Sequence, residues 1–114
     1  MINYIAEYVS LCAALHNGYG KTSVKKHNVA MKELEKLFHH AKHEQDKSFY
    51  LELLQNESSQ VQLIAAAHCL GLNEYIREAK KVLRTIAKDK TNPELAFEAQ
   101  ATLDVWKEQG YLQF

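Results

Sequence analysis

The stretch TNPELAFEAQATLDVWKEQG, residues 91–110, has the start, the apolar spacing and the end of a single helix. Asn92-Pro93 is typical of an N-cap followed by proline at the first helical position, and Gly110 is typical of a C-cap. At about 100° per residue, its apolar residues fall on two sides of the helix, although a surface helix needs only one. The first side holds Leu95, Ala99, Leu103 and Trp106, and the second holds Phe97, Ala101 and Val105.

The rest of the 114-residue chain also has the pattern of helices joined by short connections. Apolar residues recur at spacings of three and four, which is typical of amphipathic helices. Gly18, Gly20 and Gly71 stand where helical patterns stop, Ser58 or Ser59 is placed to N-cap a helix, and Asn73 is placed to N-cap the next. We therefore expect further helices at about 2–17, 21–42, 45–56, 59–70 and 74–89.

The spacing of apolar residues also predicts which side chains are buried in these helices. In the first expected helix the apolar face holds Ile2, Ile5, Val9, Cys12 and Ala13. In the second it holds Val24, His27, Met31, Leu34, Phe38 and Ala41. The third carries Phe49, Tyr50, Leu53 and Leu54, and the fifth carries Ile76, Ala79, Val82, Leu83 and Ile86.

The fourth and the last expected helices align as an internal repeat. Gln60 corresponds to Glu94, an offset of 94 − 60 = 34 residues, which lies within the range of helical repeats. We expect the faces formed by Ala65 with Cys69, and by Ala99 with Leu103, to be core. On the other face apolar residues of the fourth helix are replaced by acids in the last, as expected for the end of a solenoid that no further repeat covers. The pattern predicts an all-α fold, a helical repeat (α-solenoid) of about six antiparallel helices, in a single domain over residues 1–114.

Composition limits the classes of function. Fourteen basic and fourteen acidic residues give a net charge of zero, which argues against a dedicated nucleic-acid binder. No segment approaches the roughly 18 consecutive apolar residues of a membrane helix, and the first residues lack the basic start of a signal peptide. We therefore expect a cytoplasmic protein with no membrane partner, in which Cys12 and Cys69 are reduced thiols.

Four segments of the sequence are VQLIAAAHCL (61–70), AKKVLRTIA (79–87), ELAFEAQATLDVW (94–106) and HNVAMKELEKLF (27–38). Together they resemble a family of small bacterial HEAT-like proteins of unknown function, and the resemblance implies a HEAT-like right-handed helical repeat. Members share a V-R-x-x-A-A segment, an A-x-x-V-L segment, a final E-A-x-x-x-L-x-x-W helix and an upstream N-x-x-x-x-x-L pattern. The resemblance covers roughly residues 25–110, and Gln62 departs from it by standing where the family usually has arginine.

Proteins of this kind resemble the immunity proteins of bacterial polymorphic toxins, including contact-dependent inhibition systems. The resemblance implies that the chain binds a cognate toxin domain and neutralises it, without a catalytic residue or cofactor of its own. The alternative is a small helical adaptor for another protein, and a third interpretation is an enzyme that uses the histidines near residue 40.

The last helix offers the surface for such a partner. Its acids and the apolar residues among them are typical either of a solvated cap or of a partner site. Many toxins delivered into bacteria act on nucleic acid, so a basic nuclease cleft is the partner surface that carboxylates would suit. The predicted contact residues are Glu94, Phe97, Glu98, Asp104, Val105 and Glu108. If this face is only a cap, we expect the partner site on the edge formed by residues 62–66 or at the histidine-rich end of the second helix.

Other candidate sites lack a complete set of groups. His39 and His43 are one helical turn apart and His40 is adjacent, but no third metal ligand is specified nearby. Cys12 and His16 have the spacing of a Cys–His pair, yet Cys12 lies on the apolar face and no group orients the histidine. The basic run at Lys21, Lys25 and Lys26 is typical of a solvated helix start. We expect no metal, no cofactor, no nucleic-acid partner and no small-molecule substrate.

Overall fold

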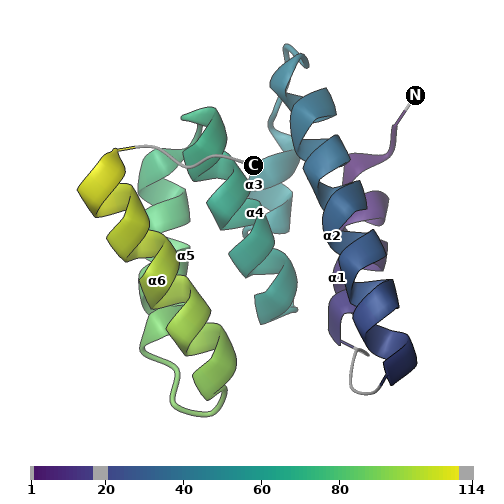
Figure 1. Ribbon diagram of the computed structural model, residues 1–114. Coiled ribbons are helices and arrows are strands. Elements are labelled where there is room, and N and C mark those ends of the chain that lie inside the picture. The colour runs from purple at the N-terminus through teal and green to yellow at the C-terminus, as the bar shows by residue number, and fades with distance from the viewer. Residues whose placement is uncertain (1, 17–20, 111–114) are drawn as a thin grey trace. The chain divides into compact units, whose positions relative to one another are not determined.

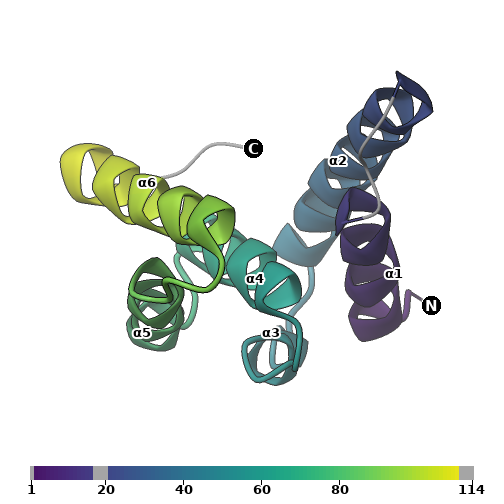
Figure 2. The same cartoon turned by 90° about the horizontal axis from the view of Figure 1, so that it is seen from below.

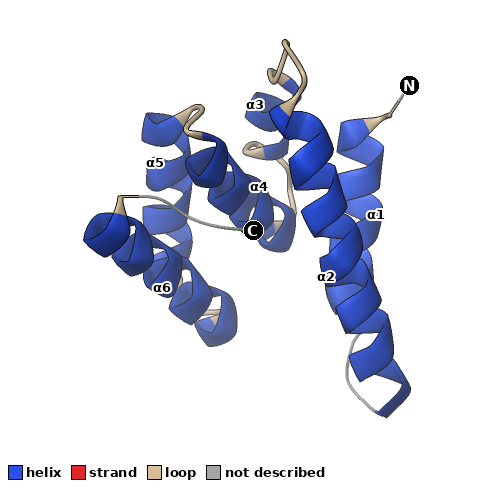
Figure 3. Cartoon of the chain, turned by 45° about the horizontal axis from the view of Figure 1, so that its top comes forward, coloured by secondary structure: helices blue, strands red, loops and turns tan. Residues whose placement is uncertain are grey.

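The computed structural model describes residues 2–16 and 21–110, and the side chains of residues 2–15 and 27–110 within them. All of the regular elements in this part of the chain are α-helices (Figure 3), which confirms the all-α prediction. The chain divides into two compact units, residues 1–49 and 50–114, and each is described by itself. The single domain over residues 1–114 stays a prediction. The expected helix ends at Gly18 and Gly20 lie outside the described residues.

The first unit is built on an antiparallel pair of helices, α1 (Tyr4–His16) and α2 (Lys21–Lys42), which pack against each other (Figure 1). The ring of Tyr4 stacks on that of Phe49, with centroids 4.3 Å apart and planes 7° from parallel. Aromatic contacts of this kind add to the area that the rings bury. The buried residues of the pair are Tyr4, Tyr8, Cys12, Ala30, Leu34, Leu37, Phe38 and Ala41.

The expected apolar face of the first helix is wrong except at Cys12. Tyr4 and Tyr8 are buried, whereas Ile2 and Val9 are 39% and 38% exposed. Tyr4, Tyr8 and Cys12 follow one another at i, i+4 and i+8 and so share a face of the helix. The large tyrosine rings bury more area than the aliphatic residues on the other faces, and they decide which face turns inward.

The expected face of the second helix is also rotated from the one observed. Leu34, Phe38 and Ala41 are buried as predicted, but Met31 and His27 are exposed. Ala30 and Leu37 are buried instead, and the side chain of Val24 lies outside the described residues.

The second unit contains the helices α3 to α6. Figure 2 places α3 and α5 in one layer and α4 and α6 in another. Helix α5 packs against both α4 and α6 and runs opposite to them (Figure 1), and α4 also contacts α6. The helices are α3 (Phe49–Leu53), α4 (Ser59–Leu72), α5 (Ile76–Ala87) and α6 (Pro93–Gln109).

Alanines are fully buried in each of the three long helices of the second unit. Ala65 in α4, Ala79 in α5 and Ala99 in α6 are all 0% exposed. A methyl side chain lets neighbouring backbones approach closely, and the larger residues beside it then fill the remaining space. Those larger buried residues are Leu53, Val61, Leu63, Cys69, Leu70, Leu83 and Ile86. The predicted core positions Ala65, Cys69 and Ala99 are confirmed.

Polar caps start α4 and α6 at equivalent places. The Ser58 hydroxyl accepts a hydrogen bond from the backbone N–H of Val61 at 3.4 Å, and the Asn92 side chain accepts one from Leu95 at 3.3 Å. The two caps are 92 − 58 = 34 residues apart, the same offset as in the sequence alignment. Gly110 ends α6 in the left-handed conformation at φ 75°, as predicted.

The boundaries of α3, the end of α4 and the start of α5 differ from those expected. Helix α3 spans only Phe49–Leu53, because the Asp46 carboxylate accepts a hydrogen bond from the backbone N–H of Ser48 and holds the preceding segment in a turn. Gly71 does not end α4, and Asn73 is not the N-cap of α5. Asn73 instead ends α4 in the left-handed conformation at φ 61°, which asparagine adopts more readily than most residues. The N-cap of α5 is Tyr75, which makes no side-chain capping bond.

Leu103 is less buried than its repeat partner. It is half-buried on α6, whereas Cys69 is 0% exposed on α4. Helix α6 is the last of the described helices, and the half-buried state of Leu103 makes the prediction that it is core only partly correct.

Leu83→Ala should lower the free energy of unfolding by about 2–5 kcal/mol, because the α5 leucine is fully buried. Leu103→Ala is the matched control and should cost clearly less, since Leu103 is half-buried. Urea unfolding followed by circular dichroism measures both. Equal losses for the two variants would contradict the packing described for α5 and α6.

Candidate functional site

The predicted partner residues share the outer face of α6. Glu94, Phe97, Glu98, Asp104, Val105 and Glu108 are all exposed. At about 100° per residue they fall within roughly 120° of the helix circumference. The middle of this arc lies opposite Ala99, the buried residue of α6. We call these six residues the acidic face.

Apolar side chains stand among the carboxylates of the acidic face. Phe97 is 75% exposed and Val105 is 39% exposed. Helix α5 therefore does not cover Phe97, and packing among residues 50–110 does not explain the apolar residues on this side of α6. An exposed aromatic ring ringed by charges is typical of a partner site.

Some carboxylates of the acidic face lie at positions where they destabilise the isolated helix. Glu94 with Glu98, and Asp104 with Glu108, are like charges at i and i+4, which destabilise a helix by about 0.2–0.5 kcal/mol per pair. Glu108 also lies in the last turn, where the helix dipole disfavours negative charge. The Asp104 carboxylate accepts a hydrogen bond from the Gln100 side chain at 3.0 Å, which fixes one acid of the face.

The histidines considered as metal ligands lie on the surface at the end of α2. His39, His40 and His43 are exposed, and the His39 ring meets that of Phe38 edge to face with centroids 5.3 Å apart. Among residues 2–16 and 21–110, no three His, Cys, Asp or Glu side chains are grouped so that they could hold an ion.

The two cysteines are buried, and burial raises the pKa of each thiol to about 12. For Cys69 the carboxylates of Glu74 and Glu78 add to this effect on the pKa. A thiol with such a pKa holds almost no thiolate near neutral pH and is a poor nucleophile. The side chains of His16, Lys21, Lys25 and Lys26 lie outside the described residues, so the proposed Cys12–His16 pair and the basic run are not described.

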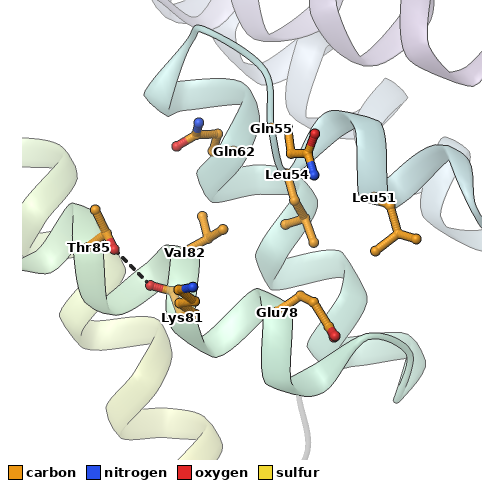
Figure 4. A pocket seen from close by; sticks show the side chains of 8 residues that line it. All are labelled: Leu51, Leu54, Gln55, Gln62, Glu78, Lys81, Val82 and Thr85. Atoms are coloured by element: carbon orange, nitrogen blue, oxygen red, sulfur yellow. Dashed lines mark hydrogen bonds between the residues drawn. The ribbon is translucent and has the colours of Figure 1, made fainter.

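Sequence reasoning missed a groove on the second unit, between α3 and α5 and over the start of α4. It has a volume of about 370 Å³, and its side chains are drawn in Figure 4. The groove brings together residues from three successive helices and from the turn after α3, and its shape depends on how these helices pack, which no local sequence pattern predicts. Its lining residues are Leu51, Leu54, Gln55, Gln62, Glu78, Lys81, Val82 and Thr85.

Comparison with known proteins found no match to a family model, to a curated protein or to a solved structure. Within the described residues, no helix has the length and apolar character needed to cross a membrane.

Cys12 and Cys69 should react with a thiol reagent such as Ellman's reagent far more slowly in the folded protein than in urea. Burial removes access, and a pKa raised from 9.0 to about 12 removes the thiolate. Because the pKa is higher in the folded state, the contribution of each thiol to stability is complete below pH 9 and is lost as the pH rises toward 12. Labelling of native protein at pH 8 as fast as in urea would contradict this burial.

Proposed function

We propose that this chain is a HEAT-like helical repeat protein that binds another protein through the acidic face. The partner proposed is the toxin domain of a bacterial polymorphic toxin or contact-dependent inhibition system, which the chain neutralises by direct binding as a cytoplasmic immunity protein. The function requires no catalytic residue and no cofactor.

Three features support the repeat. The N-caps Ser58 and Asn92 are 34 residues apart, and each accepts a hydrogen bond from the third residue after it. In each of the helix pairs α3–α4 and α5–α6, the first helix lies in one layer and the second helix lies in the other (Figure 2). Ala65 and Ala99 occupy the same position in the repeat, and both are 0% exposed. In such an array the last helix has an outer face that no further repeat covers.

The exposure of Phe97 is the observation that carries the binding function. A terminal helix that only caps a repeat is expected to be polar on its outer face, and the four acids fit that role. A phenylalanine that is 75% exposed does not fit it, because it leaves a large apolar surface in water. A partner that covers Phe97 would recover this free energy, and aromatic anchors commonly dominate binding energy.

The carboxylates favour a partner with a basic surface. Four negative charges lie along one side of α6, and carboxylates of this kind suit the phosphate-binding positions of a nuclease cleft. Opposite charge mainly accelerates encounter, whereas a desolvated anchor slows dissociation. The two contributions can therefore be measured separately.

Glu98→Lys combined with Asp104→Lys should slow association with a toxin domain encoded beside this chain, and the loss should shrink as salt is raised. Biolayer interferometry at two ionic strengths measures the rate, and survival of cells expressing the toxin measures protection. Glu35→Lys with Glu57→Lys is the matched control, since both glutamates are exposed and lie off α6. Full binding and protection by the double α6 variant would show that the acids only cap the fold.

Phe97→Ala should raise the dissociation rate by about tenfold or more, which corresponds to about 1.4 kcal/mol, with little effect on association. Its thermal stability should be close to that of the parent, because Phe97 is 75% exposed. Val29→Ala is the control, since Val29 is an exposed apolar residue on α2. An unchanged dissociation rate for Phe97→Ala would show that Phe97 does not anchor the partner.

A further inference from the structure

Helix α5 carries a row of cations along its outer side. Arg77, Lys81, Arg84 and Lys88 are all exposed. At about 100° per residue they fall within roughly 60° of the helix circumference, and with a rise of about 1.5 Å per residue they extend over about 16 Å. We call these four residues the basic stripe.

The basic stripe is not used by the packing of the second unit. It lies on the side of α5 opposite the buried residues Ala79, Leu83 and Ile86. In the part of the chain that the structure describes, no ion pair or side-chain hydrogen bond is made by any of its four side chains. Neighbouring cations at i and i+4 also destabilise the free helix by about 0.2–0.5 kcal/mol per pair.

The groove between α3 and α5 opens directly beside the basic stripe, and Lys81 belongs to both. Figure 4 shows the amides of Gln55 and Gln62 at one edge, Lys81 and Glu78 at the other, and Leu54 and Val82 between them. The groove therefore combines an apolar floor with hydrogen-bonding groups and a cationic border, as ligand sites commonly do.

The two amides have unused hydrogen-bonding capacity. The Gln62 Nε2 donates to the backbone carbonyl of Asn56 at 2.6 Å, which orients the side chain and leaves its oxygen as an acceptor. The Gln55 amide is exposed and makes no hydrogen bond within the described residues. A peptide backbone, which carries both N–H donors and carbonyl acceptors, matches these groups.

We propose that the groove and the basic stripe bind an extended acidic peptide segment of a protein partner. An aliphatic side chain of the segment packs on Leu54 and Val82, its backbone bonds to Gln55 and Gln62, and its carboxylates lie along the basic stripe from Lys81. The carboxylate of Glu78 accepts from a backbone N–H of the segment, since the segment's own acids avoid it. The site is on α5, so this proposal does not rest on the acidic face of α6.

The lining of the groove favours a peptide over nucleic acid. Sites for single-stranded nucleic acid combine cations with aromatic side chains on which bases stack, and no aromatic residue lines this groove. Duplex DNA is bound by strongly basic surfaces, whereas this chain has a net charge of zero.

The test uses phage that display short random peptides. Phage that bind the Lys81→Glu, Arg84→Glu double variant are removed first, and those that bind the full parent chain are then selected. The selected peptides should carry two or more acids next to a leucine, isoleucine or methionine. Fluorescence anisotropy with the strongest selected peptide should show a loss of affinity of about tenfold or more in the double variant. Thr85→Trp, which fills the groove, should weaken binding of the same peptide.

The matched control is Lys32→Glu with Lys42→Glu, which changes the net charge equally at exposed positions of α2 and should bind like the parent. Thermal unfolding verifies that the α5 variants are folded. Failure to enrich acidic peptides, or equal binding by the Lys81→Glu, Arg84→Glu variant, would overturn the proposal. Tighter binding of a duplex DNA oligonucleotide than of the peptide, lost in the same variant, would assign the basic stripe to nucleic acid and also overturn it.

Discussion

The close approach of α4, α5 and α6 at buried alanines is the constraint on which the second unit depends. Ala65, Ala79 and Ala99 have no exposed surface, and a larger side chain at any of them would force the helices apart. Packing at these positions fixes the rotation of each helix about its own axis. The outer sides of α5 and α6 follow from that rotation, because they lie opposite the buried alanines.

The two outer sides carry charges of opposite sign. A chain with zero net charge therefore presents a basic stripe on α5 and an acidic face on α6. Both contain like charges one helical turn apart, which repel each other, and the acidic face leaves Phe97 in water. Departures of this kind from local stability are expected at surfaces that bind.

Local signals in the sequence were sufficient for the helices and for the acidic face. The Asn92-Pro93 start and the Gly110 end of α6 were predictable because caps depend on a few neighbouring residues. The buried face of α1 was predicted wrongly, because it depends on the packing of the Tyr4 and Tyr8 rings. The end of α4 was also predicted wrongly, because Asn73 and not Gly71 adopts the left-handed conformation there. The basic stripe was visible in the spacing of its residues, but the groove beside it depends on how three helices meet.

Cross-linking from the acidic face tests the central claim most directly. A photoreactive p-benzoylphenylalanine replaces Phe97 in one variant and Val29, an exposed residue of α2, in another. Each variant is mixed with the proposed partner, a toxin domain that forms a complex with the parent chain, and irradiated, and the products are identified by mass spectrometry. The account predicts a cross-link to the toxin domain from position 97 and none from position 29. A complex that forms and is captured from position 29, or from neither position, would contradict it.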